Sequence, residues 1–203
     1  MATAKHLPFP DAPWGEYVTG VGIMDADAFA RWNGQDGWRY ELHEGRLIRM
    51  PGPGGAHGYI QTRLIRVLGA YLDAHQLGEI CGTACYILTI PGQLEEILCP
   101  DISYLLPLHA AAAPWRGSYQ IAAPDLVIEI ASPNDTHPKV LEKVKVYQAA
   151  GVRLLWVIWP SSKTVEIWRP QKTAPTTVLT THDMLDGADI IPGFVYPIID
   201  LFK

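Results

Sequence analysis

The chain has 203 residues, a length that suits one sizeable domain. Its formal net charge of −5 argues against a generally basic nucleic-acid coat protein, although it allows a local basic groove or a metal that masks acidic groups. The hydrophobic fraction of 48% and the charged fraction of 18% are typical of a globular protein with a substantial core. The sequence contains no apolar run of membrane-spanning or signal-peptide length, so we expect a soluble, cytoplasmic protein without membrane contact.

Cysteine is sparse and odd in number, with Cys81, Cys85 and Cys99 as the three residues. This usage predicts a reducing compartment and no disulfide framework. Cys81 and Cys85 are expected to share one face of a single strand as small core residues. A zinc site is not indicated, because it needs more ligands at closer spacing.

The first half of the chain predicts an irregular N-terminal arm over residues 1–24, where Pro and Gly are frequent, and one domain over 25–203. Within the domain, an Asp near residue 25 can cap a short helix, and Glu44-Gly45 supplies the turn of a hairpin. Apolar residues then recur at helical spacing up to Gln76. The expected elements are a helix over 24–32, a hairpin over 38–50, a loop over 51–58 and a helix over 57–76.

The second half predicts strands over 79–90 and 96–106, a surface connection over 107–120, and a strand–helix–strand unit. That unit has a strand over 124–131, a helix over 137–150 and a strand over 153–159, which indicates a crossover between parallel strands. Further strands follow, and an apolar C-terminal tail is expected to pack on the core. The fold class is therefore α/β, with a mixed β-sheet flanked by helices.

Two Pro-Asp dipeptides introduce strands, and they suggest where the chemistry lies. In the strand that follows Pro124, Asp125 and Glu129 share a face, because side chains alternate with period two. If the strand that follows Pro100 lies beside it, Asp101 and Glu129 point into one small volume. Converging carboxylates favour a hard cation such as Mg²⁺ or Mn²⁺, which polarises a phosphoryl group. Asp125, at the strand start, has the weaker case and is expected to hydrogen-bond local backbone.

The sequence resembles the Uma2 family, a bacterial group of endonucleases with the PD-(D/E)XK restriction-endonuclease-like fold. The resemblance covers roughly residues 25–203, and each of its motifs alone is weak while the combination is specific. The stretches that carry it are YELHEGRLIRM at 40–50, Ala56-His57-Gly58, PDISYL at 100–105, APDLVIEIASP at 123–133, EKVKVYQAAGVRLLWVI at 142–158 and IPGF at 191–194.

This resemblance implies a Mg²⁺- or Mn²⁺-dependent endonuclease that hydrolyses phosphodiester bonds of DNA. Asp101 and Glu129 match the two acidic residues of the core motif and would hold the metal, with Glu41 as an additional acid that can help. Lys143 matches a catalytic lysine displaced onto the helix, where it would position the attacking water or stabilise negative charge. His57 is a further candidate at the start of the first long helix.

Other interpretations of these residues remain open. Ala131 stands where the core motif usually has its lysine, which favours an alternative: a nuclease-like fold that no longer cuts and serves as a nucleic-acid or protein interaction module. Hydrolysis of a smaller phosphate ester is a third possibility. Taken singly, Lys143 could be a solvated helix lysine and Glu41 could face solvent. Relatives in this fold commonly dimerise, so a homodimer is also expected.

Overall fold

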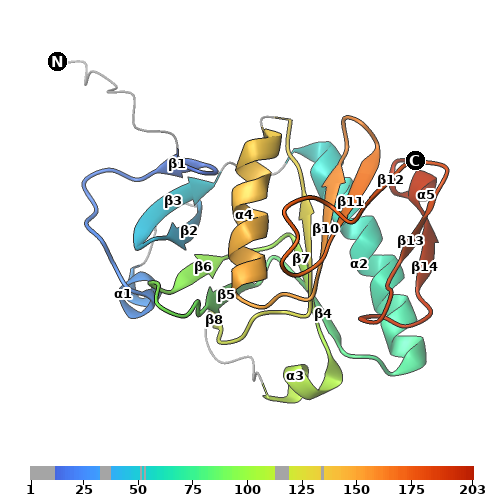
Figure 1. The fold of residues 1–203 in the computed structure, drawn as a ribbon, viewed down its shortest axis with the longest axis horizontal. Coiled ribbons are helices and arrows are strands. Elements are labelled where there is room, and N and C mark those ends of the chain that lie inside the picture. Colours follow the sequence, from blue (N-terminus) through green and yellow to red (C-terminus); the bar gives the residue numbers. More distant parts are fainter. Residues whose placement is uncertain (1–11, 33–37, 51, 53, 113–118, 134) are drawn as a thin grey trace.

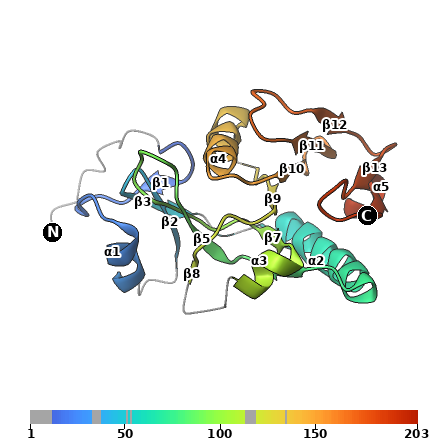
Figure 2. The ribbon, with the colours of Figure 1, turned by 60° about the horizontal axis from the view of Figure 1, so that its bottom comes forward.

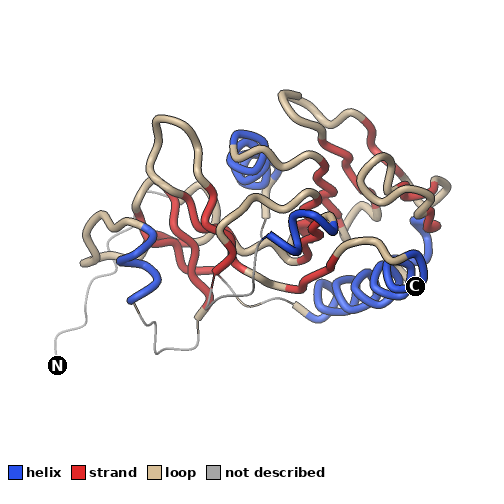
Figure 3. Tube along the Cα trace, turned by 90° about the horizontal axis from the view of Figure 1, so that it is seen from below, coloured by secondary structure: helices blue, strands red, loops and turns tan. Residues whose placement is uncertain are grey.

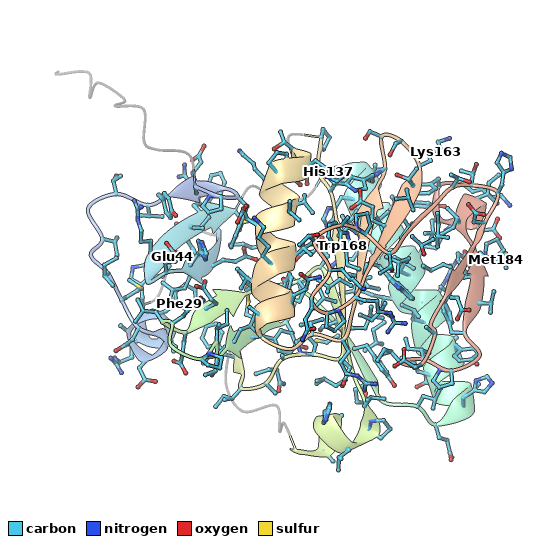
Figure 4. The ribbon with its side chains drawn as sticks, viewed as in Figure 1. Phe29, Glu44, His137, Lys163, Trp168 and Met184 are labelled. Carbon is cyan, nitrogen blue, oxygen red and sulfur yellow. A yellow bond between two sulfur atoms is a disulfide. The ribbon has the colours of Figure 1, made fainter. Side chains whose placement is uncertain are left out.

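The structure is a computed structural model that describes residues 12–32, 38–50, 52, 54–112, 119–133 and 135–203. Two six-stranded sheets and a set of helices make up this part of the chain, together with a small C-terminal hairpin. The strands form two separate groups along the long axis of the molecule (Figures 1 and 3). Phe29 and Met184 mark the two opposite ends of that axis (Figure 4). The predicted α/β class with mixed strand directions is confirmed.

The first sheet has the strand order β1-β3-β2-β6-β5-β8 and contains the predicted hairpin. Glu44 and Gly45 both have positive φ, 50° and 71°, which is the backbone of a two-residue hairpin turn. The predicted short helix α1 (Ala26–Arg31) begins after Asp25, whose carboxylate accepts from Ala28 N at 2.7 Å. The strands are β1 (Glu16–Tyr17), β2 (Arg39–His43), β3 (Arg46–Met50), β5 (Cys85–Leu88), β6 (Glu96–Leu98) and β8 (Tyr119–Gln120).

The second sheet has the order β12-β11-β10-β9-β7-β4. Its centre is the strand–helix–strand unit that the sequence predicts: β9 and β10 pair in parallel, and helix α4 connects them. On the other side of β9, β7 pairs antiparallel. The bounds are β4 (Glu79–Gly82), β7 (Ile102–Leu105), β9 (Leu126–Ile130), α4 (His137–Ala149), β10 (Leu154–Trp159), β11 (Thr164–Trp168) and β12 (Thr177–Leu179).

Helices cover both faces of this second sheet (Figure 2). On one face, Leu64, Leu68 and their neighbours on α2 (Gly55–His75) pack with Ile128 and Trp156 in the largest core cluster. On the other face, α4 packs Val144 and Tyr147 against β9 and β10, and the same cluster includes residues of the first sheet. The predicted docking of the C-terminal tail is confirmed, because its buried residues join the α2 cluster. The tail, residues 191–203, contains β14 (Val195–Pro197) and α5 (Ile198–Leu201), and β13 (Met184–Asp186) precedes it.

Two of the expected strands differ from the structure. The chain segments 79–90 and 96–106 each divide into two strands, and the two halves belong to different sheets. Thr83 has a φ of 60°, a left-handed conformation that ends β4 and redirects the chain into β5. Pro100 interrupts the second segment, because proline lacks the N–H that a continuing strand needs.

Smaller differences concern helix boundaries. Helix α2 begins at Gly55, inside the segment expected to be a loop, and it ends at His75 with Gln76 in the left-handed region as its C-cap. The connection over 107–120 contains a short helix, α3 (Pro107–Ala112), before residues 113–118, which lie outside the described residues.

The prediction that the cysteines form no disulfide is wrong for two of the three. Cys85 and Cys99 form a disulfide, while Cys81 is free. The antiparallel β5–β6 register explains the pairing. Tyr86 lies opposite Leu98, so Cys85, just before Tyr86, lies opposite Cys99, just after Leu98. Cys81 and Cys85 do not share a strand, because the turn at Thr83 sends them to different sheets.

The N-terminal segment expected to be an irregular arm contributes to the core from residue 12 onward. Ala12 and Trp14 are buried in the cluster beneath α4, and β1 pairs with β3. Residues 1–11 lie outside the described residues. Across the described ranges, no helix combines the length and the apolar character that spanning a membrane requires.

Candidate active site

Asp101 and Glu129 face each other across two neighbouring strands. The β7–β9 register pairs Ile102 with Ile128, so the preceding Asp101 lies opposite Glu129 and on the same face of the sheet. Asp101 Oδ2 accepts from the backbone N–H of Ile130 at 2.8 Å, which fixes the carboxylate against β9. Both side chains line one pocket between the two sheets, so the sequence prediction that they converge agrees with the structure.

Lys143 lines this pocket from another element, and Glu41 contacts Lys143. Lys143 projects from α4, and its Nζ lies 3.1 Å from Glu41 Oε1 on β2 and 3.6 Å from Glu129 Oε1. The Lys143 side chain is only 8% exposed, and that of Glu41 is 1% exposed. Lys143 is therefore not a solvated helix lysine, and Glu41 does not face solvent. Lys145, which the helix directs elsewhere, is exposed and pairs with Glu142.

Both carboxylate oxygens of Glu41 are occupied by protein donors. The indole Nε1 of Trp14 donates to Oε2 at 2.6 Å, and the backbone N–H of Cys99 donates to Oε1 at 3.0 Å. With Lys143 as the third donor, Glu41 makes a buried, charge-assisted anchor for the lysine. These contacts favour a role for Glu41 in positioning Lys143 over a role as a metal ligand.

The environment of Glu129 disfavours its ionised form. Burial is the largest cause; with the repulsion from the Asp101 and Glu41 carboxylates it outweighs the attraction of Lys143 and raises the pKa of Glu129 to about 7. The hydroxyl of Tyr147 donates to Glu129 Oε1 at 2.6 Å and favours the carboxylate. A further cation beside Glu129 would favour its ionised form.

Lys143 itself remains charged. Burial alone would lower its pKa, but the three carboxylates of Glu129, Glu41 and Asp101 outweigh burial and raise the pKa above its ordinary value. A lysine with a raised pKa keeps its proton at neutral pH. It can therefore offer positive charge to a substrate but cannot serve as a general base.

His57 lies at the start of α2, where the helix meets the edge of the pocket. Its Nε2 lies 3.0 Å from Asp101 Oδ1, so the imidazole and the carboxylate form a close ion pair when His57 is protonated. Burial would lower the pKa of His57, but the carboxylates of Asp101 and Glu129 overcome this effect and raise it. The structure thus brings all five candidate residues to one place.

The model of the Uma2 family, described as "Putative restriction endonuclease", matches residues 26–200. The chain belongs to the Uma2 family. The resemblance seen in the sequence is therefore confirmed. None of the curated proteins compared with the chain matches it.

A solved structure has the fold of this Uma2 chain. It is described as "a putative nuclease belonging to DUF820" from Anabaena variabilis, and it matches with a TM-score of 0.75 and 23% identity. The match covers 88% of this chain and 97% of the other. At this identity the likeness shows the fold alone, which is that of a nuclease-like α/β protein, as predicted.

Two cationic side chains of the Uma2 domain complete the pocket. Arg39, on β2, donates from Nη2 to Cys99 O at 3.1 Å, and its Nη1 lies 4.0 Å from Asp101 Oδ1. Lys139, one turn before Lys143 on α4, also lines the pocket. The cavity volume is about 60 Å³, which accommodates several waters or a hydrated ion.

Asp125 lies outside this pocket and has a structural role, as the sequence indicates. Its Oδ2 accepts from the backbone N–H of Leu106 at 2.8 Å and lies 2.7 Å from His109 Nδ1. Arg153 is 3.7 Å from Oδ1. Asp125 therefore ties β9 to the start of α3 at the opposite end of the strand from Glu129.

The sequence interpretation missed Trp14, Arg39 and Tyr147 as members of the Uma2 site. Tyr147 follows Lys143 by four residues, which places both on one face of α4, so helical spacing could have indicated it. Arg39 precedes Glu41 by two residues and shares its strand face. Trp14 gives no such signal, because its contact with Glu41 depends on how the N-terminal segment folds back.

We predict that Trp14→Phe weakens catalysis without unfolding the Uma2 domain. Phenylalanine keeps most of the buried ring but removes the donor to Glu41 Oε2, so Glu41 is free to shift and Lys143 loses its fixed position. We expect a roughly 10–100-fold lower cleavage rate, the range typical for loss of a residue that orients a catalytic group. Steady-state cleavage assays, with Trp38→Phe as an exposed tryptophan control, measure the effect. An unchanged rate in Trp14→Phe contradicts the anchoring role of Glu41.

Proposed function

We propose that this protein is a metal-dependent endonuclease that hydrolyses phosphodiester bonds of DNA. The observation that carries the proposal is the pairing of Asp101 and Glu129 in one pocket with a buried, charged Lys143. Two carboxylates and an ammonium group around a small cavity suit the transfer of a phosphoryl group, in which negative charge develops on non-bridging oxygens. Membership of the Uma2 family supports the same reaction class.

The carboxylate pair fits a hard divalent ion such as Mg²⁺ or Mn²⁺. Within the described ranges, no three His, Cys, Asp or Glu side chains are grouped closely enough to hold a metal by themselves. Mg²⁺ does not require such a group, because it is usually bound by one or two carboxylates and keeps several waters. Asp101 and Glu129 would hold the ion, which when bound would polarise the phosphate and lower the pKa of a coordinated water.

The remaining residues have separate tasks in this proposal. Lys143 stabilises the negative charge that develops on the phosphate, since its own proton is retained. Glu41 positions Lys143 through the contact at 3.1 Å. Arg39 and Lys139 bind phosphate oxygens at the pocket opening, as guanidinium and ammonium groups do in many nucleic-acid sites. The expected homodimer is not required for these steps and stays a prediction.

The test uses supercoiled plasmid DNA and the variant Asp101→Asn. We expect the wild-type protein to nick or linearise the plasmid with Mg²⁺ or Mn²⁺ and not with EDTA. Asp101→Asn should reduce the rate by at least about 100-fold, because loss of a direct metal ligand should exceed the 10–100-fold effect of residues that only support ligands. Asp73→Asn, an exposed aspartate on α2, is the matched control and should leave the rate unchanged.

Two other outcomes separate the alternatives. A wild-type protein that binds Mn²⁺ but cleaves neither plasmid DNA nor RNA, and hydrolyses a small phosphodiester instead, indicates a different substrate. A protein that binds no divalent ion at millimolar concentration and cleaves nothing is an interaction module built on a nuclease fold. Equal activity in wild type and Asp101→Asn overturns the assigned site.

A further inference from the structure

The disulfide between Cys85 and Cys99 lies at the edge of the candidate active site. Cys99 lines the pocket and precedes Asp101 by two residues along the chain. Cys99 is 3% exposed, whereas Cys85 on β5 is partly exposed. The bond therefore joins an accessible strand of the first sheet to the segment that carries one of the two carboxylates of the site.

The main chain of Cys99 holds two side chains of the site. Its N–H donates to Glu41 Oε1 at 3.0 Å, and the same oxygen accepts from Lys143 Nζ at 3.1 Å. Its carbonyl oxygen accepts from Arg39 Nη2 at 3.1 Å. A displacement of Cys99 thus acts on Arg39 directly and on Lys143 through Glu41.

The segment from Cys99 to Asp101 crosses from the first sheet to the second. Strand β6 ends at Leu98, and Pro100 cannot extend its ladder because proline has no N–H. The next strand, β7, belongs to the other sheet. The disulfide therefore fastens the first residue of this crossing covalently to β5, at the point where the strand ladder no longer does so.

We propose that the Cys85–Cys99 disulfide positions the Uma2 site, and that its reversible reduction by a dithiol lowers the rate of cleavage. The inference rests on the proposed function and deepens it, because it adds redox control of the same site. In the reduced protein, Cys99 is released from β5. The contacts of its main chain with Glu41 and Arg39 loosen, and Lys143 loses its fixed position.

The chemistry of the reduction is ordinary thiol–disulfide exchange. One thiolate of the dithiol attacks Sγ of the partly exposed Cys85, the S–S bond breaks, and Cys99 leaves as a thiolate that takes up a proton. The second thiolate of the reductant then displaces Cys85, which is also protonated. Two electrons and two protons have passed to the protein, and the reductant ends as a cyclic disulfide.

Other contacts keep the reduced protein folded, so the effect is local. Strands β5 and β6 remain paired through three residue pairs from Tyr86 to Leu88. The backbone N–H of Thr83 donates to Asp101 O at 3.0 Å, which ties the far end of the crossing to the turn before β5. Reduction thus frees the Cys99 end of the crossing while the two sheets stay in place.

The first experiment compares plasmid nicking by the full chain in its two redox states. Thiol titration should find one free thiol in protein purified without reductant, and three after treatment with dithiothreitol. We expect reduction to lower kcat at least about tenfold, the range for groups that orient catalytic residues, and reoxidation to restore it. A disulfide that only adds stability would lower the unfolding midpoint and leave kcat of the folded protein unchanged. Circular dichroism confirms that the reduced protein is folded during the assay.

Two variants serve as matched controls. Cys81→Ser removes the free thiol and should respond to reduction as wild type does, because Cys81 is not part of the bond. Cys85→Ser breaks the bond from the side away from the pocket. It should have the low kcat of reduced wild type and no further response to dithiothreitol.

A second measurement does not depend on activity. The indole N–H of Trp14 donates to Glu41 Oε2, and that of Trp168 donates to Glu166 in the second sheet, at 3.0 Å. In ¹⁵N-labelled protein we expect reduction to shift the Trp14 indole resonance, assigned by its loss in Trp14→Phe, and to leave that of Trp168 in place.

The outcomes separate this inference from the proposed function. Three free thiols in protein purified without reductant, or an equal kcat in both redox states, overturn the positioning role of the disulfide and leave the proposed function intact. An oxidised protein that cleaves nothing, yet shows the shift of the Trp14 resonance on reduction, overturns the proposed function. In that case the disulfide still positions the pocket.

Discussion

We expect the replacement of Lys143 by methionine to remove the proposed DNA cleavage and to lower the free energy of unfolding by about 3–5 kcal/mol, the usual cost of removing one partner from a buried ion pair. The size of the effect follows from the charges around the ammonium group. Lys143 lies 3.1 Å from Glu41 and 3.6 Å from Glu129, and the three side chains are largely buried. Without the lysine, Glu41 keeps its donors from Trp14 and Cys99 but loses the cation that balances its charge.

Two further variants separate charge from position. Lys145→Met, on an exposed face of the same helix, should change neither stability nor cleavage, because Lys145 forms an exposed ion pair with Glu142 at the surface. Lys143→Arg keeps the charge and should recover part of the lost stability, yet the larger guanidinium cannot occupy the same position and cleavage should stay low. Urea denaturation and plasmid nicking are the two measurements. Full activity in Lys143→Met excludes Lys143 from the reaction.

The candidate site could be predicted where local rules apply. The period-two alternation of β9 placed Glu129 on a defined face, and the two Pro-Asp dipeptides marked the strand starts that bring Asp101 beside it. The family resemblance supplied Lys143, which is 14 residues beyond Glu129 and has no local signal of its own. Glu129 and Lys143 lie on the consecutive elements β9 and α4, and Asp101 lies at the start of β7, the strand that pairs with β9, so the geometry depends on few long-range contacts.

The role of Glu41 could not be predicted in this way. Its contact with Lys143 spans 102 residues and its contact with Trp14 spans 27. The first depends on the first sheet packing against α4 and the second on how the N-terminal segment folds back, and both are properties of the tertiary structure. A carboxylate between Tyr40 and Leu42 on a hairpin looks the same in sequence whether it faces water or a buried lysine.

The division of the segments 79–90 and 96–106 into two strands each could not be predicted from the local sequence either. Ile80, Thr83, Tyr86 and Ile87, close to Cys81 and Cys85, are β-prone, and their propensity favours one long strand. Whether the chain continues in the same sheet or crosses to another depends on the backbone at Thr83, a non-glycine residue with positive φ. The backbone N–H of Thr83 donates to Asp101 O at 3.0 Å, a long-range contact that the local sequence does not reveal, so the disulfide between Cys85 and Cys99 could not be predicted either.

Glu129→Gln is expected to remove cleavage while making the metal-free protein more stable at pH 8. The pKa of Glu129 is raised to about 7 by burial and by the carboxylates of Asp101 and Glu41, against the opposing effect of Lys143. An acid with a raised pKa in the folded state contributes stability when it is protonated, and that stability is lost as the pH rises through the folded pKa. Glutamine accepts the Tyr147 hydroxyl bond but carries no charge.

The pH dependence of the free energy of unfolding therefore tests whether ionisation of Glu129 destabilises the folded protein. In EDTA, the wild-type free energy of unfolding should fall as the pH rises from about 4.5, the ordinary pKa of glutamate, to about 7 and should level off above that. The difference between Glu129→Gln and wild type should grow over the same window, because the contributions of His57 and other groups are shared by both proteins. Urea denaturation at several pH values gives this difference, with exposed Glu142→Gln as the control.

If the Glu129 carboxylate serves catalysis at a cost in stability, its replacement by glutamine gives a protein that is more stable and inactive. A Glu129→Gln protein that is less stable than wild type at pH 8 shows instead that the carboxylate is a structural partner of Lys143, and it sets aside its assignment as a metal ligand.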